Sequence, residues 1–526
     1  MKKLRFASAV LLAVLLTAVF CPFFPASADE ETVTLRICNW EEYIDLGGWE
    51  DDEVIDLESG DIFGENSLVE DFEIWYEENY GKKVKVEYST FGTNEDLYNM
   101  LTIGDVYDLV CPSEYMIMKL MAEDMVQPLS EAFFDEEDEN NYYIRGVSPY
   151  IRSIFENHEI NGVSWDKCAA GYMWGITGFV YNPEVVSEED ASTWQLMQNS
   201  DYKRQITMKD NVRDTYFAAV GALKSDLLTS EEFTGADDYA LRLQDEMNDV
   251  TEETVARVQD YLQDTKDNLY SFETDSGKAD MITGKVVANY QWSGDAVYTM
   301  DQAEEDDYTL NFAVPKESTN IYFDGWIMLK AGIAQDPAKQ QAAEAFINFI
   351  SMPESVIRNM YYIGYTSAIS GGEDERIFEY LDWNYGAEED VAEDEEEVEE
   401  PDNEEDVVEE NEEGAEEEEA TVEYDLSYFF LGMGEHSEDY VLTVPAEQLN
   451  RQLSAQYPSE EVIRRASIMV YFDADQSEII NRMWIRVRCF NILDVPIWLW
   501  ITLGVLIAGG VVFYFRRKAA KEKMYS

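Results

Sequence analysis

Apolar and polar residues alternate at the start of the chain's folded part and then change to helical spacing. Val33–Cys38 alternates as a strand, and apolar residues then recur every three or four positions over 68–81, where Gly81 ends the predicted helix. A second strand is predicted at Val84–Tyr88, a second helix at Asn94–Leu101 and a third strand at Tyr107–Cys111. This strand-helix-strand-helix-strand order predicts a parallel sheet with right-handed crossovers.

Aromatic and acidic residues follow two of these strands. Trp40 to Tyr43 come after the first strand, and Ser113, Glu114 and Tyr115 come after the third. Because ligands of open parallel sheets bind beyond the carboxyl ends of the strands, we expect these two segments to be neighbours. Carboxylates placed among large rings are unfavourable without a cation, so this edge of the sheet is a candidate cation site.

The second half of the chain predicts a second lobe. Tyr172–Tyr181 is apolar and contains glycine, which is typical of a strand that crosses between lobes, and Val286–Trp292 and Asn311–Val314 are further strands. Asp336 followed by Pro337 predicts the start of a helix, because proline is favoured at the first helical position. The expected fold class is therefore α/β with two lobes.

Both ends of the chain carry apolar runs. Residues 1–28 have the basic start, apolar centre and small-residue site of a secretory signal peptide, with cleavage after Ala28 favoured over lipidation near Cys21. Residues 495–515 are uncharged and long enough to predict a transmembrane helix, and the basic residues of 516–526 predict a cytoplasmic tail. We therefore expect an extracytoplasmic protein anchored in the cell membrane by its C-terminal helix.

The charge of the chain is strongly negative. Its 526 residues include 37 Lys+Arg and 110 Asp+Glu, a formal net charge of −73, which excludes nucleic acid and anionic lipid as partners. Residues 387–422 are so acidic that we expect a disordered insertion, either a solubilising segment or a cloud that concentrates cations. The remaining charges suit cationic ligands or simply a well-solvated surface.

Cysteine and histidine give no evidence of a metal or catalytic centre. The cysteines beyond the signal lack metal-binding spacing, and Cys38 and Cys111 are read first as small buried residues and second as a disulfide. Neither His158 nor His436 lies in a known motif. No metal, cofactor or catalytic residue is predicted, so the chain is not expected to be an enzyme.

Eight ordered segments give a family resemblance. The chain resembles the spermidine/putrescine-binding proteins of polyamine ABC transporters from about residue 33 to 369 and again from about 421 to 488, through "CNWEEYI", "EYSTFGTNEDLYNML", "YDLVCPSEYM", "YMWGITGFVYNP", "DNVRDTYFAA", "YQWSGDAVY", "VPKESTNIYFDGW" and "EAFINFISMPE". The resemblance implies a two-lobed type II periplasmic-binding-protein fold with the polyamine between the lobes. It places lobe 1 at 29–172 and 323–366, and lobe 2 at 173–322 and 367–490.

The resemblance also implies roles for individual residues. Aromatic walls around the methylene chain are implied for Trp40, Tyr43, Tyr115 and Trp292. Ammonium groups are implied to contact Glu42, Asp214 and Asp324, and Asp295 aligns with an acid of putrescine-preferring relatives. Polar contacts are implied for Ser113 and Asn211, and Tyr322 falls where spermidine binders often carry Trp.

Two positions depart from the family pattern. Glu41 and Glu114 stand where relatives usually carry small or neutral residues, and both would add charge for a longer polyamine if they faced the cleft. The length of the ligand therefore stays open.

Simple chemistry supports a polyamine ligand. An α,ω-diammonium chain requires carboxylates for its ends and aromatic faces for its middle. The expected function is the substrate-binding component of a polyamine ABC importer, with permease subunits and a cytoplasmic ATPase as partners. The alternatives are a membrane-tethered sensor for polyamines or other organic cations, an extracellular amine enzyme and an adhesive surface protein.

Overall fold

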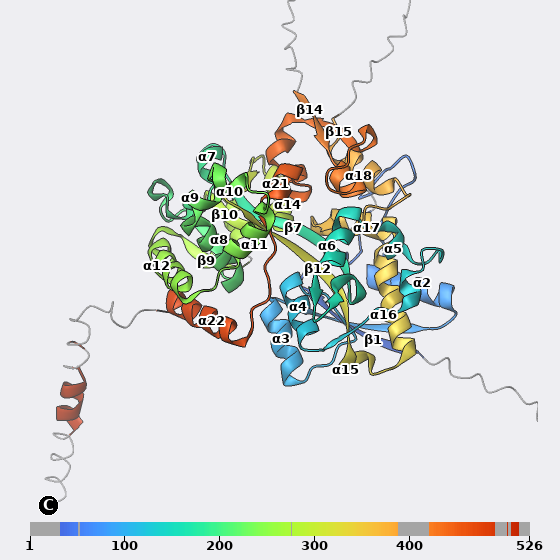
Figure 1. Cartoon of the computed structure of the whole chain (residues 1–526), viewed down its shortest axis with the longest axis horizontal. Helices are drawn as coiled ribbons and strands as arrows, with labels where there is room; N and C mark the ends of the chain where they lie inside the picture. The colour runs from blue at the N-terminus through green and yellow to red at the C-terminus, as the bar shows by residue number, and fades with distance from the viewer. Residues whose placement is uncertain are drawn as a thin grey trace, which may run out of the picture.

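The computed structural model describes residues 32–50, 53–274, 276–387, 420–489, 502 and 506–514. One large sheet runs through both halves of the molecule with the strand order β2-β1-β3-β12-β7-β10-β8-β9. In Figure 1 the two long strands β12 (Thr319–Leu329) and β7 (Ala169–Tyr181) pass between a group of helices on the left and another on the right. The structure is therefore a two-lobed α/β fold.

The first lobe carries the parallel part of the sheet that the sequence predicts. β1 (Val33–Trp40) lies between β2 (Val84–Phe91) and β3 (Leu109–Val110) and is parallel to both. β12 then pairs antiparallel with β3 and with the short β4 (Val126–Gln127). The helices of this lobe are α2 (Leu68–Tyr80), α3 (Asn94–Ile103), α4 (Glu114–Ala122), α5 (Tyr142–Gly146), α6 (Pro149–Asn157), α15 (Lys330–Ile333), α16 (Pro337–Ile350) and α17 (Pro353–Ile363).

The second lobe is built on the other half of the sheet. β7 pairs antiparallel with β10 (Ala288–Trp292) and β11 (Asn311–Ala313), and β8 (Ile206–Lys209) lies parallel to both β10 and β9 (Ser271–Glu273). Its helices are α7 (Glu188–Ala191), α8 (Val212–Leu223), α9 (Ser225–Leu228), α10 (Glu231–Thr234), α11 (Tyr239–Met247), α12 (Glu252–Asn268), α13 (Ser276–Ile282), α14 (Ser293–Glu304) and α22 (Ala474–Arg488), the last packed on α12.

The remaining elements pack on helices and strands of the two lobes. The hairpin of β14 (Thr421–Asp425) and β15 (Val441–Pro445) stands at the top of Figure 1 beside α18 (Arg376–Tyr385). Helices α19 (Ser427–Leu431), α20 (Gln452–Gln456) and α18 pack on α6, α14 and α17 respectively. The other elements are the helix α21 (Glu460–Arg464) and the short strands β5 (Glu159–Ile160), β6 (Val163–Ser164), β13 (Thr366–Ser367) and β16 (Ala466–Ser467).

Local sequence signals define several helix ends as expected. Ser67 and Glu70 form a capping box at the start of α2, and Gly81 ends that helix with a left-handed φ of 63°. Asp336 accepts a hydrogen bond from the Ala338 N–H, and Pro337 begins α16 as predicted. The predicted parallel strands and the predicted crossing strand are likewise confirmed.

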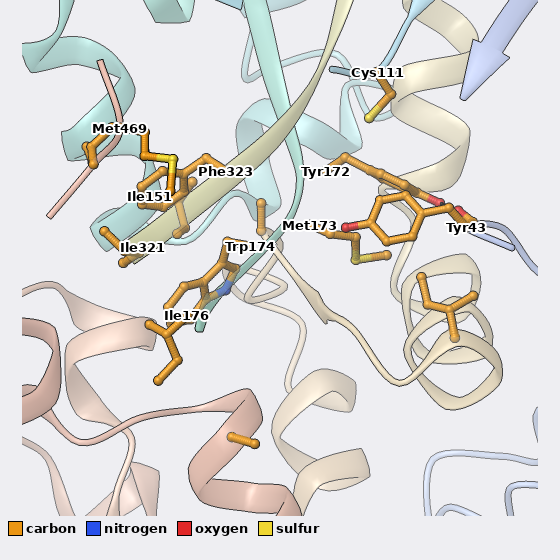
Figure 2. Close-up of a cluster of buried hydrophobic side chains, with 14 of the residues drawn as sticks. Tyr43, Cys111, Ile151, Tyr172, Met173, Trp174, Ile176, Ile321, Phe323 and Met469 are labelled. Carbon is orange, nitrogen blue, oxygen red and sulfur yellow. Dashed lines mark hydrogen bonds between the residues drawn. The ribbon is translucent and has the colours of Figure 1, made fainter. Parts of the chain in front are cut away.

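The two crossing strands are buried along their whole length. Every residue of β7 and β12 is buried, and Figure 2 shows their large side chains packed on both sides of the crossing point. Trp174 and Trp326 are among the largest fully buried side chains. Full burial of a large apolar side chain contributes roughly 1.5–3 kcal/mol. The packing along β7 and β12 therefore fixes the two strands from which both lobes extend.

Cys38 on β1 and Cys111, which directly follows the neighbouring β3, are buried free thiols, as the first interpretation of these residues predicts. Residues 1–31, which include the predicted signal peptide, and residues 388–419 of the predicted acidic insertion lie outside the described residues.

The predicted C-terminal transmembrane helix is wrong. Among the described residues, no helix is long and apolar enough to cross a membrane. Of the predicted span 495–515, the structure describes residue 502 and a helical piece at 506–514 only.

Candidate ligand-binding site

A cavity of about 1060 Å³ lies between the lobes. Its walls come from the loop after β1, the start of α4 and one face of β12 in the first lobe, and from α8, α13 and α14 in the second. All the residues that the sequence predicts for the site line it, namely Trp40, Glu41, Glu42, Tyr43, Ser113, Glu114, Tyr115, Asn211, Asp214, Trp292, Asp295, Tyr322 and Asp324. The expected proximity of the β1 and β3 ends is confirmed.

Alternate residues of β12 face the cavity. Asn320, Tyr322 and Asp324 all line it, as expected for side chains two positions apart on one face of a strand. The sheet register shifts between Asp324 and Gly325, so Asp324 stands at the last position before the ladder with β7 changes. This strand therefore carries a carboxylate and an aromatic ring to the centre of the cavity.

Asp324 is a buried carboxylate that contacts neutral donors. The Tyr43 hydroxyl donates to one carboxylate oxygen at 2.6 Å, and the Ser113 hydroxyl donates to the other at 2.7 Å. Burial raises the pKa of Asp324 to about 6, although both hydrogen bonds oppose the shift. In the described part of the chain, no lysine or arginine forms an ion pair with this carboxylate.

Glu114 lies beside Asp324. Its carboxylate accepts a hydrogen bond from the Phe323 N–H at 3.2 Å. Burial raises the pKa of Glu114 to about 8, and the negative charge of Asp324 adds to that rise. Glu114 is therefore largely protonated at pH 7, so it faces the cleft without adding a full charge there.

Asp214 is positioned by its helix. The Asn211 side chain caps α8 and accepts hydrogen bonds from the N–H groups of Arg213 and Asp214, which sets Asp214 in the first turn. Burial raises the pKa of Asp214 to about 6, while nearby Lys209 and a hydrogen bond from Trp292 lower it. Asn211 thus serves at least as much to build the helix end as to present an amide to the cavity.

Asp295 has cationic neighbours that the sequence did not predict. Its carboxylate lies 3.1 Å from the Lys209 Nζ and 3.6 Å from the Lys278 Nζ, and it accepts a hydrogen bond from the Tyr365 hydroxyl at 3.1 Å. Burial alone would raise the pKa of Asp295, but these lysines and the tyrosine lower it below its usual value. Asp295 is therefore ionised, and the ammonium groups of the two lysines already balance its negative charge.

Two further contacts join the lobes across the cavity. The Arg213 guanidinium of α8 stacks between the rings of Tyr115 and Phe472, 4.5 Å and 3.8 Å from their centroids. Its Nη2 donates to the Val470 carbonyl at 2.6 Å. Lys278 of α13 also lies 3.9 Å from the Glu42 carboxylate, which belongs to the first lobe.

The acidic pair after β1 lies at the rim. The Glu42 side chain is 88 % exposed and Glu41 is also exposed, whereas Tyr43 is buried. Figure 2 shows Tyr43 beside Tyr172, whose hydroxyl donates to the Tyr43 carbonyl at 2.7 Å. The loop therefore turns one ring into the cavity and leaves its two carboxylates in water.

A buried ion cluster holds this loop in place. The Arg358 guanidinium donates to the Asp45 carboxylate at 2.9 and 2.6 Å, to Asp71 at 2.7 Å and to the Asn66 carbonyl at 2.7 Å. Asp45 itself is fully buried. Because the loop returns from the cavity at this point, the cluster positions Tyr43.

Metal binding has no structural support in the part of the chain that the structure describes, where no group of three or more His, Cys, Asp or Glu side chains is placed to hold an ion.

A family model for bacterial extracellular solute-binding proteins matches residues 67–377, more than half of the 526-residue chain. The chain belongs to this family. Solute-binding proteins bind their ligand for transport, and the predicted extracytoplasmic location fits that role.

Curated relatives of this solute-binding protein are polyamine binders by name. The putrescine-binding periplasmic protein PotF of Escherichia coli is 23 % identical over 298 residues, which cover 54 % of this chain and 71 % of PotF. The spermidine/putrescine-binding periplasmic protein of Escherichia coli is 22 % identical over 342 residues, which cover 65 % of this chain and 78 % of that protein.

Solved structures share the fold. The spermidine/putrescine ABC transporter substrate-binding protein of Streptococcus pneumoniae superposes with a TM-score of 0.51 and 21 % identity, covering 87 % of this chain and all of its own. A protein of Listeria monocytogenes described as a putative spermidine/putrescine ABC transporter gives a TM-score of 0.55 at 18 % identity, covering 87 % of this chain and 99 % of its own. At sequence identities this low, the structural similarity shows the two-lobed fold alone.

Proposed function

We propose that this solute-binding protein is the polyamine-binding component of an ABC importer. It captures putrescine or spermidine outside the cytoplasm by closure of its two lobes and delivers the closed complex to the permease subunits, which a cytoplasmic ATPase drives. Closure would be a hinge motion at the crossing strands, near the predicted lobe boundaries at residues 172 and 322. No chemical step is part of this function.

The observation that carries the proposal is the environment of Asp324. A buried carboxylate with only neutral donors is unfavourable, and an arriving ammonium would form a charge-assisted hydrogen bond with it. Tyr43, Tyr115, Trp292 and Tyr322 supply aromatic walls for the methylene chain between ammonium groups. Glu42 at the rim would attract the cation before it enters rather than hold it inside.

Thermal unfolding of the full-length chain tests the proposal. Putrescine, cadaverine, spermidine and spermine are compared with 1,4-butanediol, which matches putrescine in length but carries no charge. A true ligand at 100 times its Kd stabilises the folded state by about 2.7 kcal/mol, so the midpoint should rise in a saturable manner with at least one polyamine. The diol should have no effect. No rise with any of the four polyamines would contradict the proposal.

Affinity should also depend on pH. Asp324 and Asp214 both have a pKa of about 6 in the ligand-free protein, so they are mostly ionised at pH 7 and mostly protonated at pH 5. Because an ammonium binds the ionised form, lowering the pH from 7 to 5 should weaken binding by about tenfold for each carboxylate that contacts an ammonium.

Titration calorimetry at pH 6, in buffers that differ in ionisation enthalpy, should therefore detect protons released when the polyamine binds. A constant affinity between pH 5 and 7 with no proton release would show that neither carboxylate contacts the ligand.

A further inference from the structure

Lys209 makes the contacts that a ligand ammonium would make. It ends β8 directly behind the cavity wall, against the lining residues Trp292, Asp295 and Thr274, and its side chain is 2 % exposed. Its Nζ lies 3.1 Å from the Asp295 carboxylate, 3.8 Å from the centroid of the Trp292 ring and 3.3 Å from the Thr274 carbonyl oxygen. A carboxylate, an aromatic face and a carbonyl oxygen are the partners expected for a desolvated ammonium group.

Lys278 adds to this arrangement. Its Nζ lies 3.6 Å from the other carboxylate oxygen of Asp295, so two protein ammonium groups face one carboxylate. A ligand ammonium placed at Asp295 would meet both positive charges at close range in a partly desolvated site, where like-charge repulsion is strong. At the Trp292–Asp295 end of the cavity, the negative charge of Asp295 is therefore already balanced by the two lysines.

The other buried acids differ from Asp295. Asp324 contacts the hydroxyls of Tyr43 and Ser113, and Asp214 has no direct ion pair in the described part of the chain. Glu114 is largely protonated at pH 7 because its pKa is raised to about 8. Among the described residues, Asp324 and Asp214 are therefore the buried carboxylates of the cavity that are ionised at pH 7 and form no direct ion pair, which matches a ligand with two ammonium groups.

This inference rests on the proposed function and narrows it. We propose that Lys209 is a specificity-determining residue whose ammonium occupies the Trp292–Asp295 position, so that the site takes a diamine in preference to a triamine. Among the described residues, a third ammonium, as in spermidine, finds no further buried carboxylate in the cavity that lacks a cationic partner, because Glu41 and Glu42 line it only at the exposed rim. Removal of the Lys209 charge frees Asp295 for it.

The test is calorimetric titration of the full-length chain with putrescine and with spermidine at pH 7. The measured quantity is the ratio of the spermidine Kd to the putrescine Kd. In the unchanged protein this ratio should exceed 10. Lys209→Met keeps an unbranched side chain that is one atom shorter and removes its charge, and it should lower the ratio at least tenfold.

Three further variants separate the explanations. Lys209→Met combined with Asp295→Asn removes both charges, so the ratio should return toward that of the unchanged protein. Lys278→Met removes the more accessible of the two lysines and should shift the ratio in the same direction by less, which keeps the test valid if Lys209→Met fails to fold. Lys224→Met is the matched control, because Lys224 also pairs with acids, Glu246 at 2.7 Å and Asp249 at 2.9 Å, but neither of these acids lines the cavity, whereas Asp295 does.

The outcomes are distinguishable. If polyamines bind but folded Lys209→Met and Lys278→Met leave the ratio unchanged, or if Lys224→Met changes it equally, the inference is overturned while the proposed function stands. The inference is also overturned if the unchanged protein prefers spermidine. If no polyamine binds to any of these proteins, the proposed function fails and the inference fails with it.

Discussion

Replacement of Asp324 by asparagine is expected to weaken putrescine and spermidine binding by roughly 30-fold to several thousand-fold, because loss of one partner of a buried, hydrogen-bonded charge pair costs about 2–5 kcal/mol. Asparagine keeps the shape of the side chain. Its amide oxygen can accept from one of the two hydroxyls, Tyr43 or Ser113, that now contact Asp324 at 2.6 and 2.7 Å, and its NH2 group can donate to the oxygen of the other. The fold should therefore persist while the charge that receives the ammonium is lost. Titration calorimetry of the full-length variant measures the change.

Glu114→Gln is the matched control for this experiment. Glu114 is also buried in the cavity wall, but its raised pKa of about 8 leaves it largely neutral at pH 7, so a neutral amide changes little. Its effect on affinity should be less than about tenfold, or under about 1.4 kcal/mol. Equal effects on affinity from the two variants, whether small or large, would contradict the assignment of Asp324 as the main carboxylate that binds an ammonium group.

Replacement of Arg358 by methionine is expected to lower the free energy of unfolding by about 3–5 kcal/mol, because it leaves the carboxylate of Asp45 buried without a counter-ion. Asp45 is 0 % exposed and receives two hydrogen bonds from the guanidinium. Since whole domains are stable by only about 5–15 kcal/mol, the loss should be large. Urea unfolding followed by tryptophan fluorescence measures it.

Arg36→Met provides the comparison for a surface ion pair. Arg36 pairs with Glu87 at 3.0 Å, but the two side chains are 47 % and 60 % exposed, and such pairs contribute about 0–1 kcal/mol. A similar loss of stability in both variants would mean that the Arg358 cluster does not hold the loop that carries Tyr43. We expect the Arg358 variant also to bind polyamine less tightly, because that loop lines the cavity.

The neighbourhood of the site could be predicted from sequence because local patterns fix it. Alternation and helical spacing identify β1, β3 and the helices between them, and parallel strands bring their carboxyl ends to one edge. Ser113, Glu114 and Tyr43 were therefore expected to meet, and they do. The period of two along β12 likewise carries Tyr322 and Asp324 to the same face.

The charge balance of the site could not be predicted in this way. Lys209 and Lys278 come from two separate segments and meet Asp295 only through tertiary packing. The one sequence signal for Lys209 was a lysine at the carboxyl end of a strand in a very acidic chain. Exposure was also unpredictable, since Glu42 and Tyr43 are adjacent but lie on opposite sides of a loop, one in water and the other buried.

The measurement that tests the central claim most directly is a calorimetric titration of the full-length chain with putrescine at pH 7. The account predicts saturable binding with one putrescine per chain, and loss of that binding in Asp324→Asn under the same conditions. No heat of binding and no thermal stabilisation from a folded protein, or binding that Asp324→Asn leaves unchanged, would contradict the claim that the cavity between the lobes holds an organic cation at Asp324.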